Sequence, residues 1–236
     1  DTSHLSAQQV IAKIVKLKPK RKFAKMNFSY KIVYSLARFF FKSFFRLKIY
    51  GLGHFPTNQA IIAANHCSFY DPPVLSISCP EEVHFLARGT LFDIPIIGRL
   101  IRTLNAHPVS RDASDIQTFK EIIQLLQKRK KMILFPEGQR SYDGSLLPLE
   151  RGLGFLVQKA KCRIIPAYID GTYNAWPRER KFPKLFGKMR VVFGSPIEFR
   201  EDVNKKVGQE RIVRETEQAI LKLKKWLESG ARGNPP

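Results

Sequence analysis

The stretch AIIAANHCSFYDPP, residues 60–73, carries the clearest structural signal in the chain. Its first five residues, Ala60–Ala64, are small or branched and apolar, as is typical of a buried strand. The two prolines that end it favour the first turn of a helix, so we expect a helix to begin at Asp71. His66 then lies in the turn between strand and helix. We interpret the stretch as the beginning of an α/β unit.

The spacing of His66 and Asp71 raises a chemical question. Positions five apart on a continuous helix point about 140° away from each other, so the two side chains can meet only because the chain bends between them. If Asp71 accepts a hydrogen bond from the imidazole, it orients the ring and leaves the other nitrogen free to take a proton from an alcohol. If Asp71 is only a helix N-cap, His66 is an ordinary loop residue. Cys67 adds a covalent route as a weaker alternative, because catalytic Cys/His pairs are normally distant in the chain.

Short apolar runs alternate with helical periods beyond Gly51. The predicted strands are Ala60–Ala64, Val83–Leu86, Met132–Phe135, Ile164–Ile169 and Val191–Phe193. One helical face comprises Ile116, Phe119, Ile122, Ile123 and Leu126, preceded by a capping box of Ser114 and Gln117; a second comprises Ile212, Thr216, Ala219, Ile220, Leu223 and Leu227. This alternation predicts an α/β fold with a largely parallel central sheet flanked by helices. Two of the unusual polar strings, Asn65-His66 and Pro136–Gly138, follow strands, where ligands bind in such sheets.

The 236-residue chain is strongly basic, with 41 Lys and Arg against 20 Asp and Glu, a net charge of +21. Such an excess implies an anionic partner: nucleic acid, an acidic membrane surface or a phosphorylated substrate. Residues 1–50 hold twelve of the basic residues and a single acid, Asp1. We therefore expect residues 1–50 to form a basic helical arm and residues 51–236 to form the α/β domain. Since Met26 is available as a start, residues 1–25 are open to interpretation as a processed or added segment.

The arm contains FSYKIVYSLARFFFKSFFRLKIYG, residues 28–51, in which a narrow basic stripe runs beside aromatic residues. No uncharged run approaches the ~18 residues that a transmembrane helix needs, whereas this pattern suits a helix lying in the membrane interface. The predicted membrane-binding residues are Lys31, Arg38, Phe39, Phe40, Lys42, Phe44, Phe45 and Arg46. The open alternative is a core-packing helix with a solvated basic face. Upstream, the pattern of Val10–Leu17 predicts a shorter helix that Pro19 ends. The two predicted helices together would form a membrane-binding unit.

The three cysteines and five histidines limit which disulfide bonds and metal sites are possible. Cys67, Cys79 and Cys162 are far apart with no CxxC pair, which argues against a disulfide framework and fits a reducing, cytosolic compartment. No histidine pair has metal-ligand spacing, so we expect no metal and no cofactor. No nucleic-acid-binding motif is present, so a nucleic-acid partner is not expected.

Two further strings indicate a site for a phosphate. Arg88 and Arg111 bracket an apolar run punctuated by Pro and Gly, and FPEGQRSYDG, residues 135–144, places Gly138 at a tight turn next to Arg140 and Ser141. Guanidinium groups bind phosphate through paired hydrogen bonds, and the amides of a turn form anion-holding nests. Ser141 lacks the Gly-x-Ser-x-Gly elbow of a nucleophile, so we assign it a hydrogen-bonding role. Each residue also has a purely structural or solvated interpretation.

These blocks together resemble the glycerophospholipid acyltransferases, specifically the bacterial lysophosphatidic acid acyltransferases. Their Asn-His-x-x-x-x-Asp block is similar to Asn65–Asp71, and their Phe-Pro-Glu-Gly-x-Arg-Ser block to Phe135–Ser141. The intermediate arginine block is similar to Arg88–Arg111, and the later apolar-Pro block to Ile164–Ile169. Order and spacing agree over roughly Leu52–Pro196.

The resemblance implies transfer of a fatty acyl group from acyl-CoA or acyl carrier protein to the sn-2 hydroxyl of lysophosphatidic acid, giving phosphatidic acid. It implies His66 as the base and Asp71 as its partner, and Arg88, Arg111 and Arg140 as ligands of the acceptor phosphate. Asn65, Glu137, Gly138 and Ser141 would shape the site. It also implies a membrane-binding helical motif before the domain, and hence a peripheral or monotopic protein on the cytoplasmic face of the cell membrane. The positive charge of the chain makes an anionic membrane surface the expected partner there.

Several residues depart from the family pattern. Arg88 stands where lysine is common, Asn105-Ala106 where glycine often opens a turn, and Gln139 where threonine is frequent, while Cys67 is an uncommon filler. Asn tolerates a left-handed backbone, so we expect the turn at Asn105 to survive. These departures leave open which headgroup the lipid acceptor carries. Another lysophospholipid or glycerol 3-phosphate is the alternative acceptor, and a non-catalytic basic module for membrane or nucleic acid is the alternative class.

Overall fold

A seven-stranded sheet organises the protein. The computed structural model describes residues 24–109 and 115–236. The strands, in chain order, are Lys48–Tyr50 (β1), Ala60–Ala64 (β2), His84–Arg88 (β3), Ala106–Val109 (β4), Lys131–Leu134 (β5), Arg163–Asp170 (β6) and Arg190–Phe193 (β7). Their spatial order is β1-β7-β6-β2-β5-β3-β4, and every neighbouring pair is parallel except β6 and β7. The predicted α/β fold with a largely parallel sheet is confirmed.

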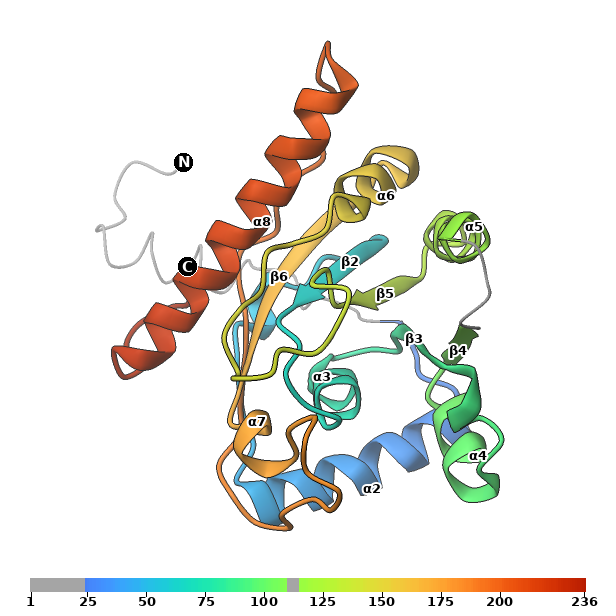
Figure 1. Cartoon of the computed structure of the whole chain (residues 1–236), viewed down its shortest axis with the longest axis vertical. Coiled ribbons are helices and arrows are strands. Elements are labelled where there is room, and N and C mark those ends of the chain that lie inside the picture. The colour runs from blue at the N-terminus through green and yellow to red at the C-terminus, as the bar shows by residue number, and fades with distance from the viewer. Residues whose placement is uncertain (1–23, 110–114) are drawn as a thin grey trace, which may run out of the picture.

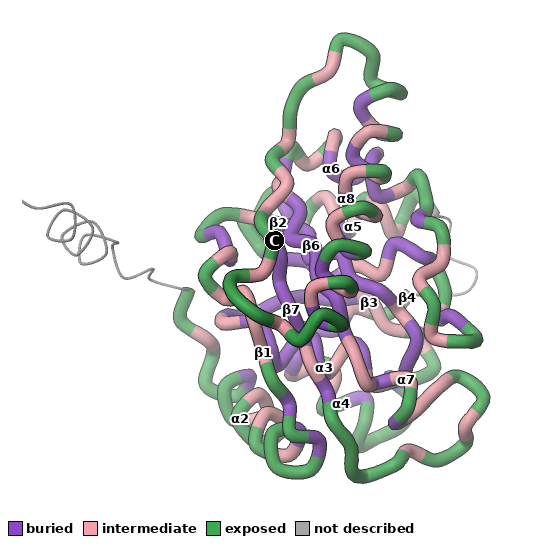
Figure 2. The backbone as a smooth tube through the Cα atoms, turned by 90° about the vertical axis from the view of Figure 1, so that its left-hand side faces the viewer, coloured by how far each residue is buried: buried purple, intermediate pink, exposed green. Residues whose placement is uncertain are grey.

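Helices cover both faces of this sheet (Figure 1). They are Phe28–Phe45 (α2), Asp71–Ser78 (α3), Pro95–Thr103 (α4), Asp115–Gln127 (α5), Gly152–Ala160 (α6), Thr172–Ala175 (α7) and Lys205–Glu228 (α8). In β2, Ile62 packs with α2 and α3 on one face, and its neighbour Ile61 packs with α5, α6 and α8 on the other. Successive side chains of a strand point to opposite faces, so β2 is apolar throughout because both of its faces are buried. The strands form the buried centre of the tube in Figure 2.

The five predicted strands correspond to β2, β3, β5, β6 and β7, and the two predicted helical faces belong to α5 and α8. Five elements were not anticipated: the edge strands β1 and β4, and the helices α4, α6 and α7. Asn105 has a φ of 60°, so the expected left-handed turn before β4 is present. The predicted helix Val10–Leu17 and the capping residue Ser114 lie outside the described residues.

The helix α2 is packed into the fold, which corrects part of the membrane-binding prediction. Phe45 is fully buried, so it is a core residue and not a membrane contact. Arg38 is half-buried, and its Nη1 donates to the carbonyl of Ile77 in α3 at 2.7 Å, so it does not belong to a free basic stripe. Phe40 also packs against the core. The core-packing alternative is therefore correct for the inner side of α2.

The outer side of α2 keeps the other predicted residues. Phe39 is 71% exposed, Phe44 is 38% exposed, and Lys31, Lys42 and Arg46 are exposed. In the residues that the structure describes, no helix is both long and apolar enough to span a bilayer. The chain leaves α2 directly into β1, which pairs with β7, so the sheet includes residues from the predicted arm. The expected boundary at residue 50 therefore falls at the end of an edge strand.

Substitution at two phenylalanines of α2 tests this packing. We expect Phe45→Ala to lower the free energy of unfolding by about 3–5 kcal/mol, because it opens a cavity in the core. We expect Phe39→Ala to change it by less than about 0.5 kcal/mol, because that side chain is largely in solvent. Urea denaturation followed by far-UV circular dichroism measures both values. Equal effects would contradict the docking of α2 on the domain.

Candidate active site

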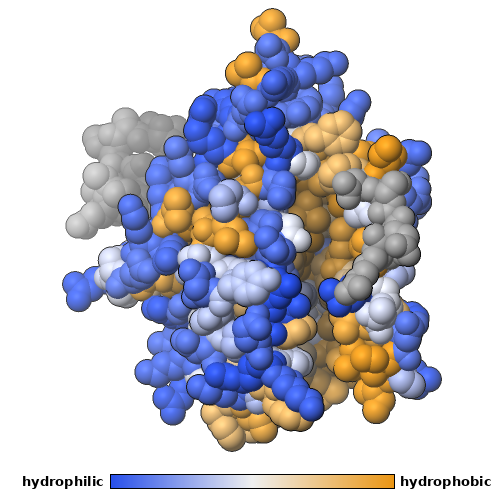
Figure 3. Space-filling view, viewed as in Figure 1, coloured by the Kyte–Doolittle hydropathy of each residue, from blue (hydrophilic) through white to orange (hydrophobic). Residues whose placement is uncertain are grey.

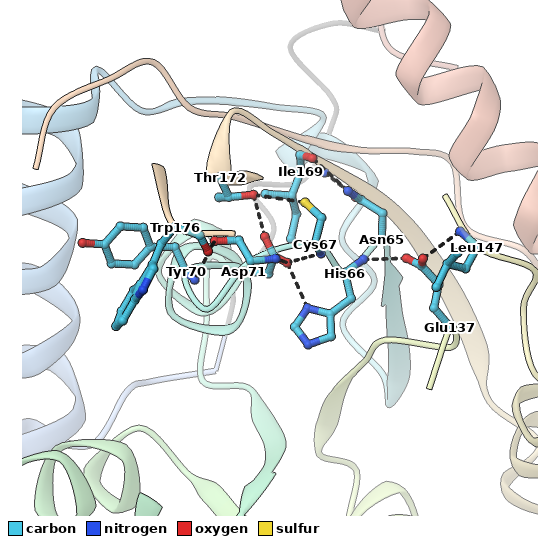
Figure 4. Close-up of polar contacts among 11 residues, drawn as sticks. Asn65, His66, Cys67, Tyr70, Asp71, Glu137, Leu147, Ile169, Thr172 and Trp176 are labelled. Atoms are coloured by element: carbon cyan, nitrogen blue, oxygen red, sulfur yellow. Dashed lines mark hydrogen bonds and ion pairs between the residues drawn. The ribbon is translucent and has the colours of Figure 1, made fainter. Parts of the chain in front are cut away.

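The side chains of His66 and Asp71 meet across the turn between β2 and α3 (Figure 4). His66 Nδ1 lies 2.9 Å from Asp71 Oδ2, and the second ring nitrogen points away from the carboxylate. The helix begins at Asp71, as predicted, with Pro72 and Pro73 in its first turn. The imidazole is 18% exposed, so it remains accessible from outside. The predicted contact between the two residues is confirmed.

The carboxylate of Asp71 also holds the turn itself. It is fully buried, and Oδ2 accepts hydrogen bonds from the backbone N–H groups of Cys67 and Ser68, each at 2.7 Å. Oδ1 accepts from the hydroxyl of Thr172 at 2.6 Å. A buried carboxylate is stable only when its oxygens are satisfied in this way. Asp71 therefore fixes the backbone of the turn as well as the imidazole.

Glu137 links the turn after β5 to the turn after β2. Its Oε1 accepts from the backbone N–H of His66 at 2.6 Å, and its Oε2 accepts from the N–H of Leu147 at 2.8 Å. The side chain is 3% exposed, and burial raises the pKa of this carboxyl to about 7, a shift that the two backbone hydrogen bonds oppose. Glu137 is thus placed to set the position of His66.

Three other predicted shaping residues make backbone contacts around the same turn. The amide of Asn65 donates to the carbonyl of Ile169 and accepts from its N–H, which continues the pairing of β2 with β6 by a side chain. Ser141 N–H donates to the carbonyl of His66 at 2.8 Å, and the Ser141 hydroxyl donates to Asp143. Gly138 has a φ of +69°, which favours glycine at the tight turn after β5. All three support the shape of the site.

The structure describes two of the three arginines predicted to bind the phosphate, Arg140 and Arg88. Arg140 lies over the ring of Phe69 at 3.6 Å, and its Nη1 is buried without a hydrogen-bond partner among the described residues. Burial and the neighbouring Arg178 and Arg88 lower the pKa of Arg140, while Asp71 raises it. Glu179 also raises it. Three guanidinium groups near two carboxylates still leave an excess of positive charge for an anion. Arg88 is exposed at the end of β3.

Arg111 falls outside the described residues, so its predicted role stays a prediction.

An apolar groove adjoins His66. It has a volume of about 660 Å³ and lies between the carboxyl end of β5 and the helices α5 and α6. Its wall includes Leu134, Phe135, Ile122 and Leu153. Phe135 also stacks on the imidazole of His66, with ring centroids 4.1 Å apart and planes at 20°. The groove is visible as an apolar hollow in Figure 3, and the stacking places His66 at its polar end.

The two alternative nucleophiles are both engaged elsewhere. Cys67 is buried with its sulfur 3.7 Å from the hydroxyl of Thr172, and burial raises the pKa of its thiol far above the ordinary value. The reactive thiolate is therefore disfavoured. Ser141 is fully buried, and its hydroxyl bonds Asp143 and the N–H of Gly144. Neither residue presents a nucleophile.

Sequence reasoning missed three residues of the site: Thr172, Phe135 as a stacking partner, and Arg178. Thr172 and Arg178 follow β6, about a hundred residues after the turn that they approach. Arg178 stacks on Tyr142, 4.4 Å from its ring, close to Arg140. The available signal was the position of these residues just beyond β6, a predicted strand, since carboxyl ends of neighbouring parallel strands meet at one edge. Within residues 24–109 and 115–236, no group of His, Cys, Asp and Glu could hold a metal.

The raised pKa of Glu137 gives a pH-dependent stability. The folded protein holds this carboxyl protonated up to about pH 7, whereas the unfolded chain releases the proton at the ordinary, lower pKa. Its contribution to stability is therefore present at low pH and lost as pH rises through 7. We expect the unfolding free energy of wild type relative to Glu137→Gln to fall by roughly 2 kcal/mol between pH 5 and 8. Thermal denaturation of both proteins across this range measures it, and a difference independent of pH would contradict the assignment.

Comparison with known proteins adds an independent line of evidence. The Acyltransferase family model matches residues 46–170, a little over half of the chain. The chain is 30% identical over 158 residues to the chloroplastic 1-acyl-sn-glycerol-3-phosphate acyltransferase LPAT1 of Arabidopsis thaliana, covering 65% of this chain and 44% of that protein. It is 28% identical over 153 residues to the 1-acyl-sn-glycerol-3-phosphate acyltransferase of Bacillus subtilis strain 168, covering 64% of this chain and 73% of that one.

A solved structure agrees with these relatives. The crystal structure of PlsC, the 1-acyl-sn-glycerophosphate acyltransferase of Thermotoga maritima, superposes with a TM-score of 0.63 and 28% identity, covering 80% of each chain. The chain spans less than half of the length of the plant relative LPAT1. The matched region contains the turn of His66 and Asp71, the residues Glu137 and Arg140, and six of the seven strands. This chain belongs to the Acyltransferase family.

Proposed function

We propose that this protein is a 1-acylglycerol-3-phosphate acyltransferase. It transfers a fatty acyl group from the thioester of acyl-CoA or acyl carrier protein to the sn-2 hydroxyl of lysophosphatidic acid, and the product is phosphatidic acid. The observation that carries the proposal is the 2.9 Å contact between His66 and Asp71 at the end of an apolar groove and beside Arg140. The names of the relatives in Arabidopsis and Bacillus support the same reaction.

The two ring nitrogens of His66 have different roles in the proposed reaction. Asp71 accepts a hydrogen bond from the N–H of Nδ1, so Nε2 carries the lone pair that removes the proton from the sn-2 hydroxyl. The alcohol oxygen then attacks the thioester carbonyl, forming the new ester bond as the carbon–sulfur bond breaks. The departing thiolate takes the proton from His66, which restores the neutral ring. The negative charge of Asp71 stabilises the imidazolium that exists between these two transfers.

The acceptor phosphate binds to the arginines. Arg140 supplies a buried N–H group with no partner in the described part of the protein, and Arg88 and Arg178 add positive charge around it. Planar guanidinium groups hold a phosphate monoester through paired, charge-assisted hydrogen bonds. The groove beside Phe135 lodges the hydrocarbon chain of the donor. The two substrates thus approach His66 from a cationic and an apolar side.

The outer side of α2 contacts the membrane in this proposal. Exposed Lys31 and Lys42 lie on the same helix as the exposed Phe39 and Phe44, and exposed Arg46 directly follows it, a combination that binds anionic lipid surfaces. The protein is then peripheral, on the cytoplasmic face of the cell membrane, where its lipid acceptor resides. Acceptors such as another lysophospholipid or glycerol 3-phosphate remain the alternative, and a panel of acceptors with one acyl donor distinguishes them.

Removal of the base His66, or of the negative charge of Asp71, tests the mechanism. We expect His66→Ala to lower kcat by about 10³-fold or more, because proton removal is lost. Asp71→Asn keeps an oxygen for the imidazole and the turn amides, and its amide can donate to Thr172, but the charge is gone; we expect a loss of about 10²–10⁴-fold. Acyl transfer to lysophosphatidic acid, with release of free thiol as the readout, measures both. Cys67→Ala is the matched control and should retain most activity, and trapping of an acyl group on Cys67 would replace direct attack by a covalent route.

Substitution of Arg140 tests the acceptor site. We expect Arg140→Lys to raise the KM for lysophosphatidic acid about tenfold or more with a smaller change in kcat, because a point charge replaces a planar pair of donors. The KM for the acyl donor should stay within about twofold. The exposed Arg200 provides a control, since Arg200→Lys keeps a solvated charge after β7. Equal changes for donor and acceptor would contradict a specific role in phosphate binding.

A further inference from the structure

The segment between α7 and β7 exposes large apolar side chains on a fixed backbone. We refer to residues 177–188, PRERKFPKLFGK, as the aromatic loop. Phe182 is 70% exposed, Leu185 is 54% exposed and Phe186 is 68% exposed. Two backbone hydrogen bonds hold the second half of the loop: Lys184 N–H donates to the carbonyl of Ala175 at 2.8 Å, and Gly187 N–H donates to the carbonyl of Phe44 at 3.2 Å. These side chains are therefore held outward by an ordered backbone.

The aromatic loop packs against Phe44 at the C-terminal end of α2. The rings of Phe186 and Phe44 lie 5.4 Å apart, and the loop runs beside the C-terminal end of α2. Along α2, the exposed apolar residues recur every three or four positions, so they share one face. They are Phe28, Ile32, Leu36 and Phe39. Figure 3 shows apolar side chains along the lower edge of the molecule, where α2 lies in Figure 1.

A second apolar group lies beyond the other end of this face. The helix α4 packs against α2, yet it and the turn before it expose five apolar side chains. Those residues are Leu91, Ile94, Ile96, Ile97 and Leu100, of which Ile96 is 82% exposed. In Figure 3 they form the apolar patch over α4. Contiguous apolar surfaces of this kind on ordered elements mark an interaction site.

The charges on these elements identify the occupant. The aromatic loop carries exposed Lys181, Lys184 and Lys188, and α4 carries exposed Arg99 and Arg102. Since the outer side of α2 is basic as well, a second copy of this chain would bring like charges together, which is unfavourable. An anionic lipid surface instead accepts the apolar side chains below its headgroups and attracts the lysines and arginines beside them.

We propose that the aromatic loop and α4 flank α2 in a three-part face that docks on an anionic bilayer. A single amphipathic helix binds the membrane surface, whereas a face of three elements also fixes the orientation of the whole domain on that surface. Binding by this face does not require the reaction at His66, so it is measured without substrates and is separable from the proposed activity.

The docked loop lies next to the turn of His66. Trp176, directly before the loop, accepts hydrogen bonds at its carbonyl from the hydroxyl of Ser68 at 2.8 Å and from the N–H of Phe69 at 3.2 Å. Its ring contacts those of Phe69 and Tyr70. A lipid acceptor that leaves the bilayer beside the aromatic loop therefore has a short path to the imidazole.

Vesicle binding of the full chain tests the proposal. The probes are vesicles of phosphatidylcholine with phosphatidylglycerol, and vesicles of phosphatidylcholine alone. We expect the loop variant Phe182→Ser/Leu185→Ser/Phe186→Ser and the α4 variant Ile96→Ser/Ile97→Ser each to bind the anionic vesicles at least tenfold more weakly than wild type in co-sedimentation. A loop variant with Lys181→Gln and Lys184→Gln should lose affinity and show a weaker dependence on salt.

The matched control is Val203→Ser/Val207→Ser, which removes two exposed apolar side chains at the N-terminal end of α8. That end packs beside α6, away from α2 (Figure 1). The control should bind vesicles as wild type does, and circular dichroism should show all variants folded. Wild-type binding by the loop and α4 variants would overturn the proposal. A stable dimer of the wild type that dissociates in the loop variant would also overturn it, since a second copy would then cover the face.

Discussion

The buried carboxylate of Asp71 is the constraint on which the site depends. Four donors converge on it: the imidazole of His66, the N–H groups of Cys67 and Ser68, and the hydroxyl of Thr172. An uncompensated charge at this depth would be strongly unfavourable, so the donors and the carboxylate require one another. The N-terminal end of α3 adds favourable dipoles, because Asp71 is its first residue. Thr172 brings the chain after β6 into the same network, which is how a local turn becomes fixed to the sheet.

The sheet explains why the remaining functional residues gather at this point. The strands β6, β2, β5 and β3 are adjacent and parallel, and their carboxyl ends lead to Thr172, His66, Glu137 and Arg88 respectively. From there an aromatic series continues outward: Tyr70 contacts Trp176 as well as Phe41 and Phe45 of α2. Because Phe45 is a core residue, α2 cannot move independently of the turn. The proposed membrane face and the proposed base are therefore parts of one packed unit.

Patterns in the sequence predicted the strands and helices that have a clear periodicity or characteristic end residues. They failed for features that depend on how distant parts of the chain pack together. β2 and α3 were recognisable because a fully apolar run precedes two prolines, and the contact of His66 with Asp71 followed from the bend that they impose. The strands β1 and β4 have only three and four residues, β4 contains Pro108, and both lie at sheet edges, so neither shows a periodic pattern. Amphipathicity could not tell which side of α2 meets the core, and it wrongly assigned Phe45 to the membrane. Thr172 and Arg178 required tertiary structure, because nothing in their own neighbourhood connects them to residues a hundred positions earlier.

The arrangement of side chains also bears on the order of bond making. An acyl-enzyme route needs a nucleophile that is accessible and readily ionised. The sulfur of Cys67 is buried beside Thr172, and burial favours its protonated form. The hydroxyl of Ser141 is turned towards Asp143 and stabilises the loop that begins there. His66, by contrast, has one nitrogen committed to Asp71 and the other directed away from it, next to an apolar groove lined by Phe135. Among the described residues, this geometry therefore favours a base acting on an incoming alcohol over an acyl-enzyme intermediate.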